Sequence, residues 1–335
     1  MKNLHIKTIA MSGVILSAIA LYAPPMAAQT TLRITLQLPL KNHLGQNLLE
    51  FKEQVESRSG GDIAVEIYDS AQLYKDKEVP QAVGSGAIEM GVASLTRFVG
   101  DVPAVDIFYQ PFLFNSDELI GKATARGSSV RAPLDEAILQ KTGARVLWWQ
   151  AYGSAVFLSR GDDVRSPHRI ADKKVRVFGK TLGSFVQACG AAPTLISGSE
   201  QYLAYQRGIV DIGMTGVSGV KSRKLWEVMD TITKTQHGDI EFVVVINDAF
   251  WNKLPDSTRA IITAAAEAAE RSVRGRMGAI ERDAYAAAAQ NGMRIVTPSA
   301  DDIDRWKACA APVYEQYVED AGELGRRVLQ AARAL

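Results

Sequence analysis

One helical pattern near the C-terminus limits the possible folds more than any other feature of the sequence. After Pro255, apolar residues and alanines recur at helical spacing, with Asp256 or Ser257 as the expected N-cap, until Asn291-Gly292 ends the pattern. About 34 residues at about 1.5 Å per residue give a helix about 50 Å long, which exceeds the width of one small domain. The chain has 335 residues, a length that suits two modest domains. We therefore expect this helix to lie across two domains and to brace both.

Strand and helix patterns alternate through the rest of the chain. Strands are predicted at 32–38, 62–68, 88–93, 144–150, 174–178, 210–214 and 242–246. Helices are predicted at 43–59, 76–85, 116–141, 180–189 and 199–207. A last helix is predicted to begin with the capping-box spacing of Ser299 and Asp302 and to bend at Pro312. This order predicts α/β layers around a largely parallel sheet.

The N-terminus has the pattern of an export signal. Lys2 and Lys7 precede an apolar run at 9–23, and 26–28 offers a small-residue cleavage site, so residues 1–28 are predicted to be a signal peptide. A transmembrane anchor is the alternative, but the run is short for a bilayer and Pro24-Pro25 closes it. No cysteine follows the run, which argues against a lipid anchor. We expect a soluble mature protein outside the cytoplasm, in the periplasm of a cell with two membranes.

The charge balance and the motif content exclude several classes of function. The chain carries 38 basic and 37 acidic residues, and removal of Lys2 and Lys7 with the leader leaves 36 basic residues against 37 acidic ones. Such a balance does not indicate a nucleic-acid partner or an acidic membrane surface. No phosphate-binding loop, dinucleotide fingerprint, zinc-protease motif or nucleophile elbow occurs in the sequence. The four histidines (His5, His43, His168 and His237) lack metal-ligand spacing. We expect no cofactor, no metal and no catalytic residues.

The two cysteines, Cys189 and Cys309, leave two interpretations open. An oxidising compartment permits a disulfide. Two small apolar core residues, far apart in the sequence, are the other interpretation. The sequence has neither a CxxC motif nor a Cys/His cluster, so neither a redox site nor a zinc site is predicted. Of the two interpretations, we favour unpaired core residues.

An arginine inside an apolar strand marks the first candidate binding site. Arg176 stands between Val175 and Val177, and a buried unpaired charge is very costly. The planar guanidinium also matches a carboxylate with two parallel hydrogen bonds. The alternative is an edge-strand arginine whose side chain reaches solvent. The pattern alone does not decide between the two, and the binding hypothesis predicts an organic anion as the ligand.

Aromatic and turn residues suggest further contacts. Trp148, Trp149 and Tyr152 lie where the first α/β unit gives way to the second, so they either wall a cleft or pack in the core and hinge. Neighbouring strand residues face opposite sides, so only one of the two tryptophans can readily face a given pocket. The segments at 94–96 and 213–216 follow strands, and Ser94 and Thr215 there offer hydroxyl and N–H groups to a polar ligand or simply form turns.

A series of short motifs, in this order and spacing, resembles one known family. The motifs are SGGDI (59–63), QL (72–73), SGAIEMGV (85–92), PFLF (111–114), KVRV (174–177), GAAPT (190–194), EQYLA (200–204), GIVD (208–211), WEV (226–228) and WNKLP (251–255). Through them the mature chain resembles the solute-binding proteins of tripartite ATP-independent periplasmic (TRAP) transporters, of the dicarboxylate-binding DctP type. The resemblance implies two α/β lobes of the type II-like periplasmic binding fold, hinge strands, and capture of a ligand by closure of the lobes. It also implies that Arg176 clamps a substrate carboxylate.

From this resemblance we expect residues 29–152 plus 241–280 to form lobe I and residues 153–240 plus 281–335 to form lobe II. The candidate ligand-binding residues are Arg176, Thr215, Trp148, Trp149, Tyr152, Ser94, Phe178, Gly198, Gln37 and His237.

The chain departs from the family pattern at several pocket positions. Ala155-Val156 stand where many members carry a second arginine, and Gly198 and Thr215 stand where sialate-type members have Phe and Asn. The acidic residue that helps to coordinate a metal in some oxo-acid binders is not evident near Thr215. These differences predict a pocket with fewer charges, walled by Trp148 or Trp149. The ligand expected from them is a monocarboxylate with a neutral body, and a dicarboxylate or a sugar acid stays open.

The expected function is that of a periplasmic solute-binding protein that captures an organic acid and delivers it to the membrane permease subunits of a TRAP transporter. We expect a monomer that is not an enzyme and binds no nucleic acid. The two alternatives are a secreted lyase or isomerase of a small acid, and a ligand-binding input to a membrane sensor. The sequence favours the binding protein over the enzyme, since it offers a candidate anion clamp but no recognisable acid–base pair.

Overall fold

The computed structural model describes residues 29–335, so the predicted signal peptide lies outside the described part. The strands are β1 (Thr30–Thr35), β2 (Ile63–Tyr68), β3 (Met90–Ser94), β4 (Ala144–Ser159), β5 (Lys174–Val177), β6 (Ala192–Leu195), β7 (Gly213–Gly216), β8 (Thr231–Thr233), β9 (Asp239–Asn247) and β10 (Arg294–Val296). The helices are α1 (His43–Arg58), α2 (Val79–Gly84), α3 (Asp117–Thr124), α4 (Arg131–Thr142), α5 (Lys180–Ala188), α6 (Gln201–Gln206), α7 (Val217–Arg223), α8 (Asp248–Lys253), α9 (Asp256–Gln290) and α10 (Ala300–Arg333). Short 3-10 helices include η1 (Asp76–Glu78), η2 (Leu95–Phe98), η3 (Pro103–Tyr109) and η4 (Pro167–Arg169). Within residues 29–335, no helix is both long and apolar enough to cross a membrane.

The main sheet is mixed, whereas the sequence pattern predicted a largely parallel one. Its order is β10-β8-β4-β9-β3-β1-β2, and β7 also pairs with β4. β1 is parallel to β2 and β3, as expected for strands joined through helices. β9 runs antiparallel to β3 and β4, and β4 runs antiparallel to β7 and β8. The antiparallel pairs arise because β4 and β9 pass through the middle of the molecule in opposite directions.

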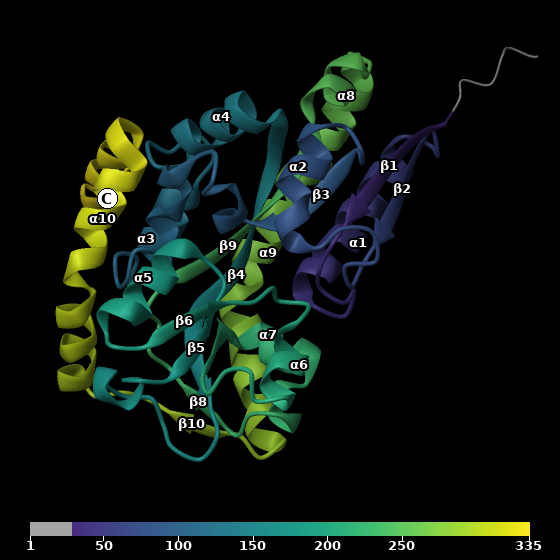
Figure 1. The fold of residues 1–335 in the computed structure, drawn as a ribbon. Helices are drawn as coiled ribbons and strands as arrows, with labels where there is room; N and C mark the ends of the chain where they lie inside the picture. Colours follow the sequence, from purple (N-terminus) through teal and green to yellow (C-terminus); the bar gives the residue numbers. More distant parts are fainter. Residues whose placement is uncertain (1–28) are drawn as a thin grey trace, which may run out of the picture.

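These two strands connect two lobes. β4 pairs with β9 from Ala144 to Ser154 and then continues with β7 and β8. Figure 1 shows β1, β2 and β3 on one side of this crossing and β5, β6 and β8 on the other, which we call lobe I and lobe II. β4 has 16 residues, whereas the strand predicted from the sequence covered only 144–150. The prediction stopped early because Gly153, with φ of 92°, and two bulges interrupt the alternation of the strand. The predicted two-lobed α/β class with hinge strands is therefore confirmed.

α9 runs along both lobes, as its predicted length required. It has 35 residues and packs on α1 of lobe I, on α7 of lobe II and on β4 (Figure 1). Its N-cap is Pro255 and makes no side-chain cap bond, so the predicted capping by Asp256 or Ser257 is wrong. Asn291 ends it, as predicted.

α10 also contacts both lobes, which the sequence did not predict. Near its start, Trp306 Nε1 donates to Arg165 O at 2.9 Å, beside lobe II. At the middle of the helix, Tyr317 Oη donates to Ala104 O at 3.0 Å in η3 of lobe I. A helix that contacts both lobes limits how far they can separate.

Two helical predictions need correction, and one is confirmed. The segment predicted as one helix at 116–141 forms α3 and α4, separated by a turn that contains Gly127 with φ of 80°. In α10 the backbone leaves the helical conformation at Gly322, and Pro312 lies inside the helix. Ser299 and Asp302 form the predicted capping box.

The two cysteines form a disulfide, so the favoured interpretation of unpaired core residues is wrong. The Cα atoms of Cys189 and Cys309 lie 5.2 Å apart, within the usual range for a disulfide. Cys189 caps the C-terminus of α5, and packing of α10 on α5 brings Cys309 beside it. The bond therefore attaches α10 to lobe II.

Candidate functional site

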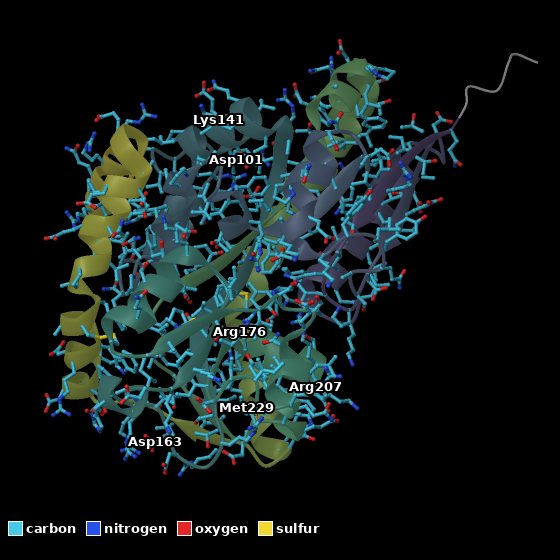
Figure 2. The ribbon with its side chains drawn as sticks, viewed as in Figure 1. Asp101, Lys141, Asp163, Arg176, Arg207 and Met229 are labelled. Carbon is cyan, nitrogen blue, oxygen red and sulfur yellow. A yellow bond between two sulfur atoms is a disulfide. The ribbon has the colours of Figure 1, made fainter. Side chains whose placement is uncertain are left out.

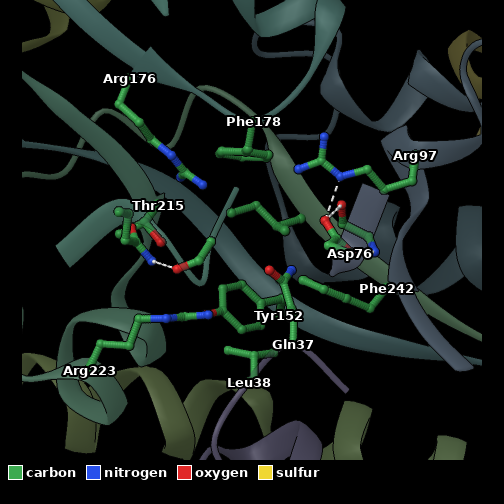
Figure 3. A pocket seen from close by; sticks show the side chains of 14 residues that line it. Gln37, Leu38, Asp76, Arg97, Tyr152, Arg176, Phe178, Thr215, Arg223 and Phe242 are labelled. Atoms are coloured by element: carbon green, nitrogen blue, oxygen red, sulfur yellow. Dashed lines mark hydrogen bonds and ion pairs between the residues drawn. The ribbon is translucent and has the colours of Figure 1, made fainter. Parts of the chain in front are cut away.

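A narrow cavity lies between the two lobes, against the hinge strands (Figure 3). Lobe I contributes Gln37, Leu38, Asp76, Ser94 and Arg97; lobe II contributes Arg176, Phe178, Gly198, Gln201, Thr215 and Arg223; and the hinge strands contribute Tyr152, Ile240 and Phe242. The cavity volume is about 30 Å³, far below the roughly 300–1,000 Å³ of open ligand pockets. The lobes are therefore closed on each other, and a solute can enter only when they separate.

The strand β5 directs Arg176 into this cavity. Val175 and Val177 are buried in the core of lobe II, so the alternation of the strand places Arg176 on the opposite side. β5 lies between β6 and the bridging residue Ile212, and it is therefore not an edge strand. Arg176 is only 3% exposed, and Figure 2 labels it near the middle of the view, in lobe II. The alternative of an edge-strand arginine that reaches solvent does not hold.

Three hydrogen bonds to backbone carbonyls hold the Arg176 guanidinium. Nε and Nη2 donate to Ile196 O at 3.0 and 2.8 Å, and Nη1 donates to Met214 O. The Phe178 ring lies beneath the guanidinium, with its centre 5.2 Å from Cζ. Burial lowers the pKa of Arg176, and no acidic residue between 29 and 335 is paired with it. A guanidinium has five N–H groups, so two remain for an anion that would neutralise the charge.

Two further arginines, Arg97 and Arg223, which the sequence analysis did not name, reach the cavity. Figure 3 shows Arg97 entering from the side opposite Arg176 and Arg223. Arg97 Nε donates to the buried carboxylate of Asp76, which also accepts Ser94 N and Ser94 Oγ at 2.9 and 3.0 Å. Arg223 Nη1 bonds Tyr152 Oη at 3.4 Å, and no carboxylate of the described chain is paired with it. With one carboxylate against three guanidiniums, the lining carries a net positive charge.

Small and neutral polar residues complete the cavity where the lobes meet. A Cβ at Gly198 would lie 2.9 Å from Gln37 Oε1 and 3.2 Å from Arg223 Nη2, so glycine permits the close approach of the two lobes. Gln37 Oε1 is buried and has no hydrogen-bond partner within residues 29–335. Thr215, buried in β7, adds a hydroxyl group beside Arg176 and Arg223. These groups can bind polar atoms of a ligand as well as its charge.

The structure does not bring Trp148, Trp149 and His237 to this cavity. Trp148 Nε1 donates to Asn47 Oδ1 at 3.1 Å, and Trp149 Nε1 donates to Asp135 Oδ1 at 2.8 Å, both within the core. The pKa of His237 is lowered to about 3 because the ring is buried, and it stacks on Phe157. Their roles are those of core packing.

The other seven candidates line the cavity: Gln37, Ser94, Tyr152, Arg176, Phe178, Gly198 and Thr215. Sequence reasoning missed Arg97, Arg223, Asp76, Gln201, Leu38, Ile240 and Phe242. Arg223 lies in the basic run KSRK (221–224), which is typical of a solvated helix end. Ile240 and Phe242 alternate in β9 on the side that faces the cavity, a signal that could have been used.

Comparisons with known proteins agree with this geometry. The sequence profile of Bacterial extracellular solute-binding protein, family 7, matches residues 36–320. The C4-dicarboxylate-binding periplasmic protein DctP of Rhodobacter capsulatus is 26% identical over 331 residues, which cover 97% of each chain.

Solved structures share the fold. A TRAP periplasmic solute binding protein from Sulfurospirillum deleyianum, with bound succinate, gives a TM-score of 0.85 at 23% identity and covers 92% of this chain and 99% of that one. A Bordetella pertussis extracytoplasmic solute receptor binding pyroglutamic acid gives a TM-score of 0.86 at 21% identity and covers 91% of this chain and 99% of that one.

Proposed function

Because the chain belongs to the bacterial extracellular solute-binding protein family 7, the DctP type of TRAP receptor, we propose that it captures an organic acid by lobe closure and delivers it to a TRAP-type membrane permease. The proposal rests mainly on Arg176, a buried guanidinium with two free N–H groups and no acidic partner in the described chain. A ligand carboxylate supplies the missing charge and accepts both hydrogen bonds. Such a pair explains why a charge is kept in the interior of lobe II.

The charge of the lining favours a short dicarboxylate over the monocarboxylate expected from the sequence. Asp76 compensates Arg97, which leaves Arg176 and Arg223 without carboxylate partners in the described chain. Two uncompensated cations suit a ligand with two acidic groups, because each buried charge needs a partner. The DctP of Rhodobacter capsulatus is named as C4-dicarboxylate-binding, and the Sulfurospirillum structure holds succinate.

The same proposal covers the organisation of the protein. Residues 1–28 direct export to the periplasm and are removed, and residues 29–152 plus 241–280 and residues 153–240 plus 281–335 form the two lobes. α10 contacts η3 of lobe I as well as α5 of lobe II. The assignment of residues 281–335 to lobe II alone therefore suits the chain up to residue 310 better than the part of α10 beyond it. The mature protein acts as a monomer, releases its ligand unchanged, and meets its permease at the membrane.

A thermal-shift screen of the mature protein tests the proposal, with succinate and pyroglutamate as the first probes. A ligand that binds only the folded state stabilises it by about 2.7 kcal/mol at 100 times its dissociation constant. We expect succinate or another short dicarboxylate to give the largest shift. A larger shift with pyroglutamate would favour the monocarboxylate. Recovery of a chemically changed acid would favour the alternative of a lyase or isomerase.

Two substitutions then test the clamp by calorimetric titration with the best acid. Arg176→Lys keeps the charge but loses the paired hydrogen bonds, and Arg176→Ala loses both. Removal of one partner of a buried charge pair costs about 2–5 kcal/mol, so we expect Arg176→Ala to weaken binding at least about thirtyfold and Arg176→Lys to weaken it less. Arg326→Ala, at an exposed position on α10, is the control. Unchanged affinity in Arg176→Ala would refute the clamp.

A further inference from the structure

The hinge strands carry a buried carboxyl group on the side away from the ligand cavity. Ile240 and Phe242 of β9 line that cavity, so Asp239 and Glu241 face the other side of the strand, toward α9. Asp239 pairs in register with Ser154, the last residue of β4 that pairs with β9 before β4 continues with β7. Asp239 therefore lies at the crossing between the two lobes.

Within residues 29–335, no unpaired cation lies beside the Asp239 side chain. It is 4% exposed, and its Oδ2 has no hydrogen-bond partner within residues 29–335. The neighbouring cation, Arg274 of α9, donates two bonds of 2.9 Å to Glu241, which is itself fully buried. Ionisation of Asp239 would place a second negative charge beside one guanidinium that is already paired. A buried acid without a counter-ion takes up a proton instead.

The other charged groups around Asp239 do not reverse this balance. Burial, followed by the negative charge of Glu241, raises the pKa of Asp239 well above its ordinary value. Burial also raises the pKa of Glu281 on α9, whose Oε1 accepts the N–H of Ser154 at 2.9 Å. The remaining charged or titratable groups that face this region are Asp117 of α3, Tyr109 of η3, Arg282 of α9 and Lys234 before β9.

A second cavity gives this side of the hinge access to water. Its volume is about 320 Å³, and it is lined by parts of α3, α9 and β4 together with Asp239. In the closed arrangement Asp239 Oδ2 is shut off from solvent. A rotation of the lobes would bend β4 and β9 at this point, since these two strands connect the lobes and Asp239 lies where they cross.

We propose that Asp239 is a proton-binding group that couples lobe closure to pH. In the closed arrangement the carboxyl group keeps its proton; when the hinge opens, water from the second cavity reaches it and accepts the proton. Closure therefore takes up one proton, so a fall in pH favours the closed arrangement and a rise in pH favours the open one. The coupling acts through the hinge and does not rest on the identity of the acid or on the Arg176 clamp.

Infrared difference spectroscopy tests the protonation of Asp239 directly. At neutral pH we expect the carbonyl stretch of a protonated carboxylic acid in the wild-type protein and its loss in Asp239→Asn. Asp117→Asn, at the start of α3 and on the same cavity, is the matched control and should keep the band. Other buried carboxyl groups, such as Glu281 and Asp106, can contribute bands of their own, so the readout is the wild-type-minus-variant difference spectrum. A difference spectrum between the wild type and Asp239→Asn without a carbonyl band overturns the proposal.

Small-angle X-ray scattering without added acid tests the coupling. Between about pH 5.5 and about pH 8.5, we expect the radius of gyration of the wild type and of Asp117→Asn to increase, because the open arrangement, which has released the proton, gains population as the pH rises. Asp239→Asn, which keeps a neutral side chain, should stay compact at both pH values. A wild type whose size does not change, or an Asp239→Asn variant that expands equally, overturns the coupling. If Asp239→Asn fails to fold, Asp239→Ser takes its place.

Discussion

At residue 153 the hinge strand needs a backbone conformation that favours glycine. Gly153 has φ of 92°, and a Cβ there would collide with Glu281 Oε1 and lie 3.1 Å from the Met277 methyl group. We expect Gly153→Ala to lower the free energy of unfolding by about 1–3 kcal/mol, because left-handed backbone alone costs an L-residue roughly 1–2 kcal/mol and Glu281 must also move. Chemical denaturation measures this change.

Gly275→Ala is the matched control for that substitution. Gly275 lies in α9 close to the same hinge, and its added Cβ would meet no atom within 4 Å. Alanine favours a helix interior by about 0.8–1.0 kcal/mol over glycine, so we expect Gly275→Ala to be stabilising. Equal effects of the two substitutions on the free energy of unfolding would show that the backbone at residue 153 tolerates a Cβ atom as well as the helix at residue 275 does.

Single residues differ in how far their sequence context reveals their role. The sequence marked Arg176 as a candidate because a charge between two valines is unusual in a strand, but the choice between a ligand clamp and a solvent-exposed arginine came from the family resemblance. Arg97 and Arg223 could not, because each occupies a position where an arginine is ordinarily solvated, and only lobe closure brings them to one cavity. Trp148 and Trp149 were misplaced because their indole partners, Asn47 and Asp135, lie elsewhere in the sequence.

At the scale of elements, periodicity revealed α9 and most of the strands but not where β4 ends. The pattern of β4 is interrupted at Gly153 and at bulges between residues 146 and 148 and between 151 and 153, so alternation identifies only its first half. The second half is stabilised by pairing with β7 and β8, whose partner residues lie about 55 to 76 positions later in the sequence. Long-range pairing of this kind leaves little local signal.

The disulfide illustrates the same limit and leads to a prediction about α10. Cys189 and Cys309 are separated by 120 residues, and only the docking of α10 on α5 brings them together. Closing so long a loop in the unfolded chain contributes up to about 5 kcal/mol in the chain-entropy account. We expect the Cys189→Ser/Cys309→Ser double variant to lose about 2–5 kcal/mol of stability, measured by denaturant unfolding.

The reduced wild type provides the comparison for that variant. A thiol count first shows that the bond has opened, and the reduced protein should then unfold at the same denaturant concentration as the double variant. Equal stability of the oxidised and reduced proteins would mean that packing of α10 on α5 and η3 holds the helix without help from the bond.

For the molecule as a whole, the length of α9 was enough to predict two lobes, whereas the closed arrangement depends on contacts that no local pattern reveals. Asn42 Nδ2 donates to Ser222 Oγ at 3.1 Å across the lobes, and Asp106 of η3 accepts the Thr181 N–H at the start of α5 at 3.2 Å. Each such bond contributes on the order of 1 kcal/mol. If closure depends on a few weak hydrogen bonds between the lobes and on the proposed ligand, the lobes can separate again when the ligand leaves.

The ion pair between Lys75 and Glu200 tests this view of closure. Its atoms lie 2.8 Å apart across the rim of the cleft, with side chains 44% and 49% exposed, so it exists only when the lobes meet. Exposed pairs of this kind contribute little, which predicts that Lys75→Met or Glu200→Gln accelerates ligand dissociation by at most about fivefold. High salt should produce a similar acceleration in the wild type, since it screens the pair.

Stopped-flow dissociation of the acid that gives the largest thermal shift measures these rates. The reversed pair, Lys75→Glu with Glu200→Lys, should restore slow dissociation at low salt, because the attraction across the rim returns with its sign exchanged. A hundredfold effect of either single substitution would contradict the prediction. It would mean that the rim, more than the proposed contact between the ligand and Arg176, keeps the lobes closed.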